Sequence, residues 1–278
     1  MTVPEYMAVI LGSVCVVLLV LRICMARRSP FVRKCSFDSG ASKTIGTREI
    51  QEDEYAIFES AEGIMAVLAD GKGKQSGGKI ASRAAVEVFK EIFSDKNAFY
   101  NPQYYLRKAF QGANREILKL LEDGQGQACV AAVMIKDSRL YYATVGNVKI
   151  AVYRNKELVP VTVGHTIDML ARKQYSEGKL SRQEAADLLE QHRLYNFVGQ
   201  DGFQDIEFFD TPITLKGGEY ILLMSDGLYE EVRWKDIEDC LEQDGTCQEK
   251  AYALVELVNR SEAENKDNAT VVVLKVKG

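Results

Sequence analysis

Hydrophobic positions recur with two different periods along this chain, and the changes of period predict where helices and strands lie. Apolar residues at helical spacing predict a helix over 77–93 and a second one from Asn101-Pro102 onward, with the proline at the first helical position. Short apolar runs between turn residues predict strands. Before and after the two helices these runs are 55–58, 63–68, 127–135, 140–145, 149–153 and 158–161. The last four are joined by short turns, so they pair antiparallel, because parallel neighbours need a long crossover.

The second half of the chain continues this alternation of helices and strands. Ser181 and Thr246 each stand three residues before a glutamate, which is the capping-box pattern of a helix start. Helices are predicted near 166–175, 181–191 and 234–241 and after Thr246, and strands over 206–214, 220–224 and 269–276. Helix pairs among antiparallel strands predict an α+β fold, a β-sandwich of two antiparallel sheets with helices outside.

The N-terminal segment from Tyr6 to Ala26 is apolar apart from Arg22. At about 1.5 Å per residue, a helix of this length spans about 30 Å, the thickness of a hydrocarbon core. Four basic residues follow it: Arg27, Arg28, Arg33 and Lys34. The positive-inside rule then predicts a single-pass membrane anchor, with the rest of the chain in the cytoplasm. A cleaved signal peptide and a buried helix are the alternatives, and the missing basic stretch before the apolar run disfavours the first.

Charge is distributed unevenly along the chain. The net charge is −5 and residues 1–34 carry +4, which leaves −9 for the remainder. An acidic folded part excludes nucleic acid as a partner, because phosphate backbones bind basic surfaces. The six cysteines form no CxxC pair and there are only two histidines, which argues against a structural zinc site.

Acidic residues stand at the ends of several predicted strands. Glu52-Asp53 precedes the first strand, Asp70 ends the second, Asp226 follows a late strand and Asp267 precedes the last. One carboxylate at a strand end is usually a turn former or a helix cap. Several such carboxylates in a chain with two histidines favour a site with oxygen ligands for Mg²⁺ or Mn²⁺.

A nucleotide-binding loop is the competing interpretation of the turn after Asp70. Residues 73–80, GKQSGGKI, nearly match the phosphate-binding P-loop and lie between a strand and a helix. Ile80 stands where the magnesium-binding hydroxyl belongs, and the β-rich order that follows does not fit repeated βαβ units. A P-loop nucleotide hydrolase is therefore the weaker alternative.

Five stretches in a fixed order carry a family resemblance: GTREIQEDEYAIF, VLADGKG, TVGNVK, ILLMSDGLYEEV and KDNATVVVL. Together they resemble the metal-dependent serine/threonine protein phosphatases, the PPM or phosphatase-2C-like family, in a compact bacterial form. The resemblance implies that two Mn²⁺ or Mg²⁺ ions bind the protein, with a weaker third in some members. It also implies that a hydroxide bridging the two ions hydrolyses phosphoserine and phosphothreonine in proteins. The expected domains are a membrane anchor with its basic flank at 1–29, a linker and domain entry at 30–45, and a catalytic domain at 46–278.

The resemblance also implies roles for individual residues. The metal ligands would be Asp70, Gly71, Asp226, Asp267, Glu52 and Asp53. Asp70 would bridge the two ions, and the Gly71 carbonyl would bind one of them. Asp226 and Asp267 would hold the other ion, and Glu52, with Asp53 behind it, would complete the first site. Arg48 would hold the substrate phosphate, because guanidinium geometry matches phosphate oxygens.

Two departures from the family pattern leave an alternative open. Asn147 replaces an aspartate that helps to bind the third ion, for which Glu230 could substitute only in part, and Lys72 stands in the turn after Asp70. The alternative is a weakly active or inactive phosphatase-like domain that acts as a membrane-anchored binding module. For an active enzyme the expected partners are phosphoproteins and, given the predicted anchor, a serine/threonine kinase at the same membrane.

Overall fold

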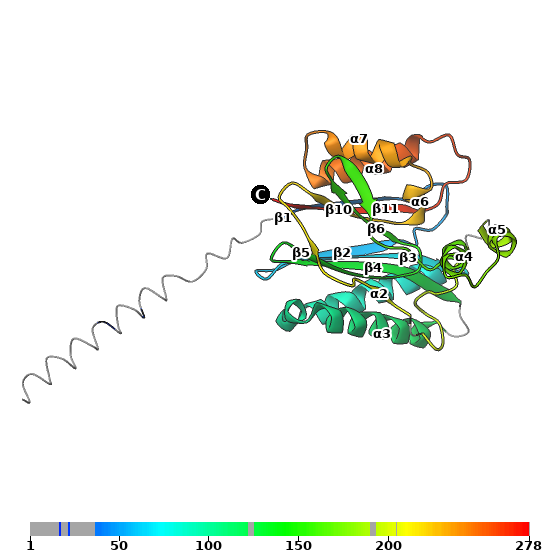
Figure 1. The fold of residues 1–278 in the computed structure, drawn as a ribbon, viewed down its shortest axis with the longest axis horizontal. Coiled ribbons are helices and arrows are strands. Elements are labelled where there is room, and N and C mark those ends of the chain that lie inside the picture. Colours follow the sequence, from blue (N-terminus) through cyan, green and yellow to red (C-terminus); the bar gives the residue numbers. More distant parts are fainter. Residues whose placement is uncertain are drawn as a thin grey trace, which may run out of the picture. The chain divides into compact units, whose positions relative to one another are not determined.

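A computed structural model of the protein describes residues 17, 22, 37–121, 125–189, 193–203 and 205–277. The chain divides between Lys34 and Cys35 into two units, and the fold lies in the second. Two antiparallel sheets are stacked in this unit, and a helix pair covers the outer face of each (Figure 1). The predicted α+β fold with two antiparallel sheets is therefore confirmed.

The first sheet has the strand order β1-β11-β10-β6-β7. Its strands are β1 (Phe37–Thr44), β6 (Lys149–Arg154), β7 (Glu157–Pro160), β10 (Tyr220–Met224) and β11 (Ala269–Val276). Helices α7 (Trp234–Glu242) and α8 (Cys247–Arg260) cover its outer face. Sequence patterns did not predict β1, because its small and polar residues do not alternate. At Gly40 the close packing of β1 against α8 requires a residue without a side chain, since a Cβ there would lie 2.3 Å from the Gln248 nitrogen of α8.

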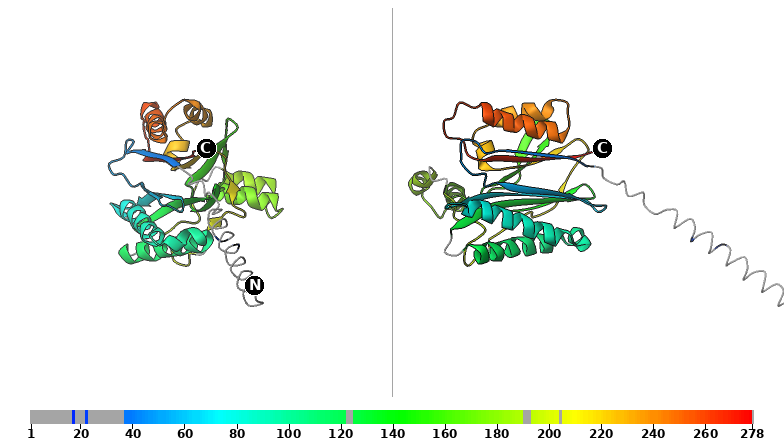
Figure 2. Two further views of the ribbon diagram at one scale, coloured as in Figure 1. Left: turned by 90° about the vertical axis from the view of Figure 1, so that its left-hand side faces the viewer. Right: turned by 180° about the vertical axis from the view of Figure 1, so that it is seen from behind.

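The second sheet has the order β2-β3-β4-β5-β8, and a short β9 also pairs with β5. Its strands are β2 (Glu54–Glu59), β3 (Ile64–Gly73), β4 (Gly126–Lys136), β5 (Arg139–Val145), β8 (Glu207–Phe208) and β9 (Ile213–Thr214). The strand predicted over 206–214 is thus two short pieces separated by a bend. The outer face carries α2 (Gly77–Phe93), the short 3₁₀ helix η1 (Lys96–Tyr100) and α3 (Pro102–Leu120) (Figure 2).

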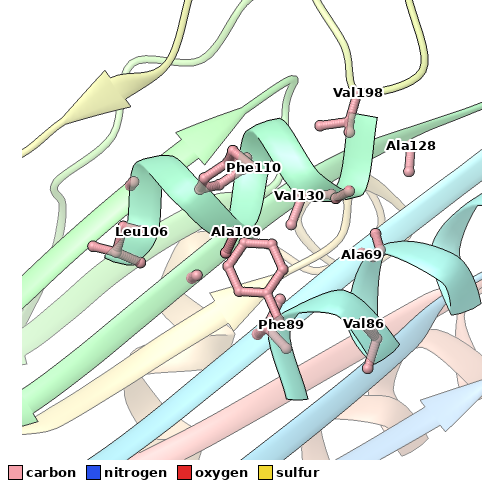
Figure 3. Close-up of a cluster of buried hydrophobic side chains, with 14 of the residues drawn as sticks. Ala69, Val86, Phe89, Leu106, Ala109, Phe110, Ala128, Val130 and Val198 are labelled. Atoms are coloured by element: carbon pink, nitrogen blue, oxygen red, sulfur yellow. The ribbon is translucent and has the colours of Figure 1, made fainter. Parts of the chain in front are cut away.

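Apolar side chains fill three layers, one between the sheets and one under each helix pair. Under α2 and α3 the rings of Phe89 and Phe110 meet edge to face, with centroids 5.1 Å apart (Figure 3). Both rings are completely buried, and such a pair contributes about 0.5–1.5 kcal/mol beyond its area. The rigid layers fix the strand ends, where the candidate site lies.

Helices α4 (Ile167–Ser176), α5 (Arg182–Leu189) and α6 (Asp226–Tyr229) lie outside the two covering pairs. Helices α4 and α5 pack on each other beside the stacked sheets, and α6 directly follows β10. The capping boxes predicted from sequence are present. Thr246 and Glu249 exchange side-chain and backbone hydrogen bonds at the start of α8, and Ser181 and Glu184 do so before α5.

The membrane placement expected from the N-terminal segment is corrected here. Within the described residues, no helix is both long and apolar enough to cross a membrane, so the single-pass localisation with a cytoplasmic catalytic domain is not retained. The segment from Tyr6 to Ala26, on whose hydropathy and length that prediction rested, lies outside the described residues apart from Val17 and Arg22. The membrane-bound kinase partner depended on the anchor and is withdrawn with it.

Candidate active site

Strand register brings the predicted acidic residues to one end of the sandwich. Glu54 pairs with Ala69, which places Asp53 and Glu52 beside Asp70 and Gly71. Asp70 does not end its strand as predicted, because β3 continues to Gly73 in its pairing with β4. In the other sheet Met224 pairs with Val271, so Asp226, just after β10, lies beside Asp267, just before β11. Arg48, Glu52, Asp70, Asp226 and Asp267 line one cleft of about 470 Å³. The two sheets therefore each contribute carboxylates to the same cleft.

Asp70 and Asp226 form the inner part of this acidic cleft. Burial raises the pKa of Asp70 well above its ordinary value, and the charges of Asp226, Asp53 and Asp267 raise it further. Neighbouring carboxylates in a poorly solvated site repel each other unless a proton or a cation lies between them. The arrangement therefore favours cation binding at the end of β3.

Glu52 lies between the end of β3 and the start of α2. Its Oε1 is buried and has no hydrogen-bond partner among the residues that the structure describes. Burial raises the pKa of Glu52, while the backbone amides of Lys79 and Gly78 lower it. A Cβ at Gly78 would lie 2.4 Å from Oε1, so only glycine leaves room for this carboxylate. An unpartnered buried oxygen beside Asp70 fits a divalent cation, and these residues therefore fit the predicted metal site.

The same geometry decides against the P-loop interpretation. The start of α2 lies against Glu52, and the amides of Gly78 and Lys79 act on that carboxylate. In a P-loop, such amides would hold a phosphate. The antiparallel order of the sheets also differs from the βαβ units of nucleotide hydrolases.

Asp53 lies behind the cleft and joins the two sheets. Its Oδ2 accepts hydrogen bonds from Ser225 Oγ at 2.9 Å and Thr270 Oγ1 at 2.7 Å. Burial raises the pKa of Asp53 to about 7, although both hydroxyls lower it. Sequence reasoning did not find Ser225 or Thr270. Ser225 directly precedes Asp226 and Thr270 is the second residue of β11, and hydroxyl residues are common at such strand ends.

Arg48 lines the cleft and is paired with one of its carboxylates. Its guanidinium binds Asp267 in a bidentate pair, with Nε 3.0 Å from Oδ1 and Nη2 2.9 Å from Oδ2. Within the described residues, no three Asp, Glu, His or Cys side chains converge as a complete metal site. Both oxygens of Asp267 accept hydrogen bonds from Arg48.

Asn147 lies in the turn between β5 and β6 and faces Asp226. Its Nδ2 donates to Asp226 Oδ2 at 2.9 Å, and its Oδ1 is buried with no hydrogen-bond partner in the described part of the chain. Lys149 Nζ lies 3.6 Å from the centre of the Tyr229 ring. Burial lowers the pKa of Lys149, and the charges of Glu230, Asp168 and Asp226 act in the opposite direction. A third cation would find one neutral oxygen and a nearby ammonium here, which is a poor donor set.

His165 is a third residue that sequence reasoning missed. Its Nδ1 accepts a hydrogen bond from the Gly146 amide at 3.0 Å, and its own amide donates to the Gly146 carbonyl at 2.8 Å. Gly146 has φ 97°, a left-handed conformation that glycine adopts without strain. His165 therefore fixes the turn that presents Asn147 to Asp226.

Lys72 is exposed and lines the acidic cleft. It was expected in a loop but lies in β3, where it pairs with Gln127. A second cleft of about 350 Å³ lies on the other side of Asp70 and Asp226, and Lys72, Asn147 and Arg193 also line it. The acidic centre is therefore open from two sides, both of which have a basic residue at the rim.

Stacked antiparallel sheets with clustered carboxylates at one end are the arrangement expected of a metal-dependent hydrolase. A protein-family comparison matches residues 42–260 to protein phosphatase 2C. The serine/threonine phosphatase stp of Listeria welshimeri is 27% identical over 237 residues, which cover 82% of this chain and 91% of that protein. The protein phosphatase PhpP of Streptococcus pneumoniae is 28% identical, over 84% of this chain and 94% of that protein.

Solved structures show the same fold. The S. agalactiae serine/threonine phosphatase has a TM-score of 0.75 and 24% identity, and the match covers 87% of this chain and all of that one. The catalytic domain of PstP, solved with two manganese ions, has a TM-score of 0.66 and 23% identity over 87% of this chain and 99% of that one. The chain belongs to the protein phosphatase 2C family. The predicted class, a protein serine/threonine phosphatase, and the predicted cofactors, Mn²⁺ or Mg²⁺, are confirmed at the level of the family.

Proposed function

We propose that the acidic cleft is the active centre, and that it hydrolyses phosphoserine and phosphothreonine in phosphoproteins. The observation that carries the proposal is the buried Oε1 of Glu52, which has no hydrogen-bond partner among the described residues, in the cleft that Asp70 and Asp226 also line. Asp70, the Gly71 carbonyl, Glu52, Asp226 and Asp267 would hold two divalent cations. When bound, such cations supply an activated water and neutralise charge on the phosphoryl group.

The residues of the chain prepare this chemistry by position and charge. Asp70 and Asp226 concentrate negative charge in a site where water is scarce, so a cation there replaces their mutual repulsion with attraction. Asp53 holds the start of β11 to the end of β10 through Thr270 and Ser225. Asp70 from one sheet and Asp226 from the other are thereby kept at a fixed separation.

Asn268 holds the neighbouring segments of the cleft in place. Its Oδ1 accepts from the Glu52 amide at 2.7 Å, and its Nδ2 donates to the Ile45 carbonyl at 2.9 Å. The main chain that carries Glu52 and the segment before Arg48 are both fixed by this one amide. Such positioning matters because small displacements of a catalytic group lower the rate steeply.

A cysteine nucleophile does not fit the site. Cys129 lies near Asp70 across the β3–β4 pair, but burial and the charge of Asp70 raise the pKa of its thiol well above the ordinary value. The thiol stays protonated at neutral pH, and a protonated thiol is a weak nucleophile. Hydrolysis by an activated water is the chemistry that remains for this set of residues.

Metal-dependent hydrolysis of an aryl phosphate and a phosphothreonine peptide by the full chain tests the proposal. We expect turnover with Mn²⁺, and a loss of about a hundredfold or more in Asp70→Asn and Asp226→Asn, since each removes a proposed ligand. Asp236→Asn is the matched control, because Asp236 is paired with Arg233 on α7. A folded protein that binds Mn²⁺ and turns over neither substrate would contradict the enzyme and leave a binding module.

A further inference from the structure

Two residues with separate proposed roles are bound to each other in this structure. Asp267 would hold a cation and Arg48 would hold the phosphate. Instead, Nε and Nη2 of Arg48 donate to the two oxygens of Asp267 at 3.0 and 2.9 Å. This edge of the guanidinium is one that can bind two phosphate oxygens at once. While the pair is formed, neither residue is available for its proposed role.

The main chain on both sides presents the two side chains to each other. The Thr47 amide donates to the Lys266 carbonyl at 3.1 Å, and the Lys266 amide donates to Thr47 Oγ1 at 3.0 Å. Gly46 has φ 62°, and a Cβ there would lie 2.3 Å from the Asp267 carbonyl oxygen. The segments before Arg48 and before Asp267 are thus joined at close range. The ion pair is a product of this backbone arrangement.

The charge of Asp267 also acts inside the acidic cleft. It raises the pKa of Glu52, Asp53 and Asp70. One carboxylate therefore faces the guanidinium and the proposed cation site together. A divalent cation on Asp267 would draw charge from the carboxylate and repel the guanidinium, so the two positive partners oppose each other there.

We propose that Asp267 exchanges Arg48 for a divalent cation, and that this exchange releases Arg48 to bind the phosphate of the substrate. The proposal rests on the function proposed above and assigns an order to it, with cation binding before phosphate binding. Because linkage is reciprocal, phosphate held by Arg48 strengthens cation binding at Asp267 by the same factor. Asp267 is then a positioning residue for Arg48 as well as a metal ligand.

The Nε–Hε resonance of Arg48 in the full ¹⁵N-labelled chain tests the exchange directly. Arg48→Lys assigns the resonance, and Mg²⁺ is added without phosphate. We expect the carboxylate-bonded resonance to disappear as Mg²⁺ binds. A resonance that keeps its bonded position at saturating Mg²⁺ would overturn the proposal.

Calorimetry of Mn²⁺ binding supplies the second test. Side-chain exposures of 56% for Arg48 and 50% for Asp267 place the pair among half-exposed ion pairs, so its removal should raise Mn²⁺ affinity about two- to fivefold. Lys72→Gln is the matched control for Arg48→Gln. Lys72 lines the same cleft with the same charge, and within the described ranges it forms no ion pair. We expect a larger gain in Arg48→Gln, and equal gains would show that only the net charge of the cleft matters.

These measurements do not depend on turnover. An inactive chain in which Mg²⁺ still releases Arg48 would contradict the proposed function and leave the exchange intact. An active chain in which the Arg48–Asp267 pair persists at saturating Mg²⁺ would contradict the exchange and leave the proposed function intact. Thermal denaturation of both glutamine variants shows that the fold is kept, as expected for side chains on the surface.

Discussion

Gly78→Ala should separate the stability of the fold from the binding of metal. Gly78 is the second residue of α2, and the added methyl group would lie 2.4 Å from Glu52 Oε1, 2.7 Å from Glu52 Cδ and 2.8 Å from the Gly71 carbonyl carbon. The carboxylate is the end of a flexible side chain and can move, but the Gly71 backbone cannot move as easily. Overpacking of this kind costs about 1–3 kcal/mol, whereas alanine gains up to about 1 kcal/mol in helix propensity.

The net expectation for Gly78→Ala is a loss of about 0–2 kcal/mol in the free energy of unfolding. This corresponds to a few degrees in Tm for a domain of this size. Displacement of Glu52 should lower Mn²⁺ affinity about ten- to hundredfold, the range seen when a metal ligand loses its orientation. Calorimetric titration with Mn²⁺ and thermal denaturation measure the two effects.

Gly112→Ala in α3 is the matched control for this prediction. A Cβ at Gly112 would meet only side chains, with Val88 Cγ1 nearest at 2.9 Å. We expect unchanged Mn²⁺ affinity in this variant. Gly78→Ala with unchanged Mn²⁺ affinity and a raised Tm would refute the reasoning, because Glu52 would then have no part in binding the cation.

Three further predictions follow from the site and the core. Asn147→Asp should raise the number of Mn²⁺ ions bound per chain from two to three, since it adds a carboxylate opposite Asp226, and an unchanged count by calorimetry would contradict this. Burial lowers the pKa of His165 below its ordinary value of 6.5, so its contribution to the free energy of unfolding is present above pH 6.5 and is lost as the pH falls through its folded-state value. Urea denaturation should show a weaker pH dependence in His165→Gln, and an identical one would refute the assignment. Phe110→Ala should cost about 3–5 kcal/mol by the same assay, because the ring is completely buried, and a loss under 1 kcal/mol would mean that the layer repacks.

The sequence predicted those features that depend on residues close together in the chain. Asp70 and Asp226 end apolar runs, and the short turns between strands determined that the sheets are antiparallel. β1 was not predicted because its small and polar residues show no periodic pattern. Close contact with α8 requires a small residue at Gly40, and such contacts cannot be read from the sequence. The segment 206–214 was taken as one strand because its apolar content does not reveal the bend between β8 and β9.

Long-range contacts were the part that sequence could not supply. Arg48 and Asp267 are 219 residues apart, and the family resemblance gave each a role without showing that they bind each other. The hydrogen bonds of Asp53 with Ser225 and Thr270 also connect segments that are distant in the chain. Hydroxyl residues are common at turns and strand ends, so these two carried no distinguishing signal before the register was known.

The division of the acidic cleft between two sheets has a consequence for how the protein matures. Asp70 lies in β3 of one sheet, whereas Asp226 and Asp267 flank strands of the other. A nascent or partly unfolded chain with only one layer formed would hold half of a cation site and bind metal weakly. Tight metal binding would thus occur only after the two sheets have packed together. A bound ion would also hold the sheets together, since a ligand specific to the native state stabilises that state by mass action. Catalytic competence and correct assembly would therefore be acquired in the same event.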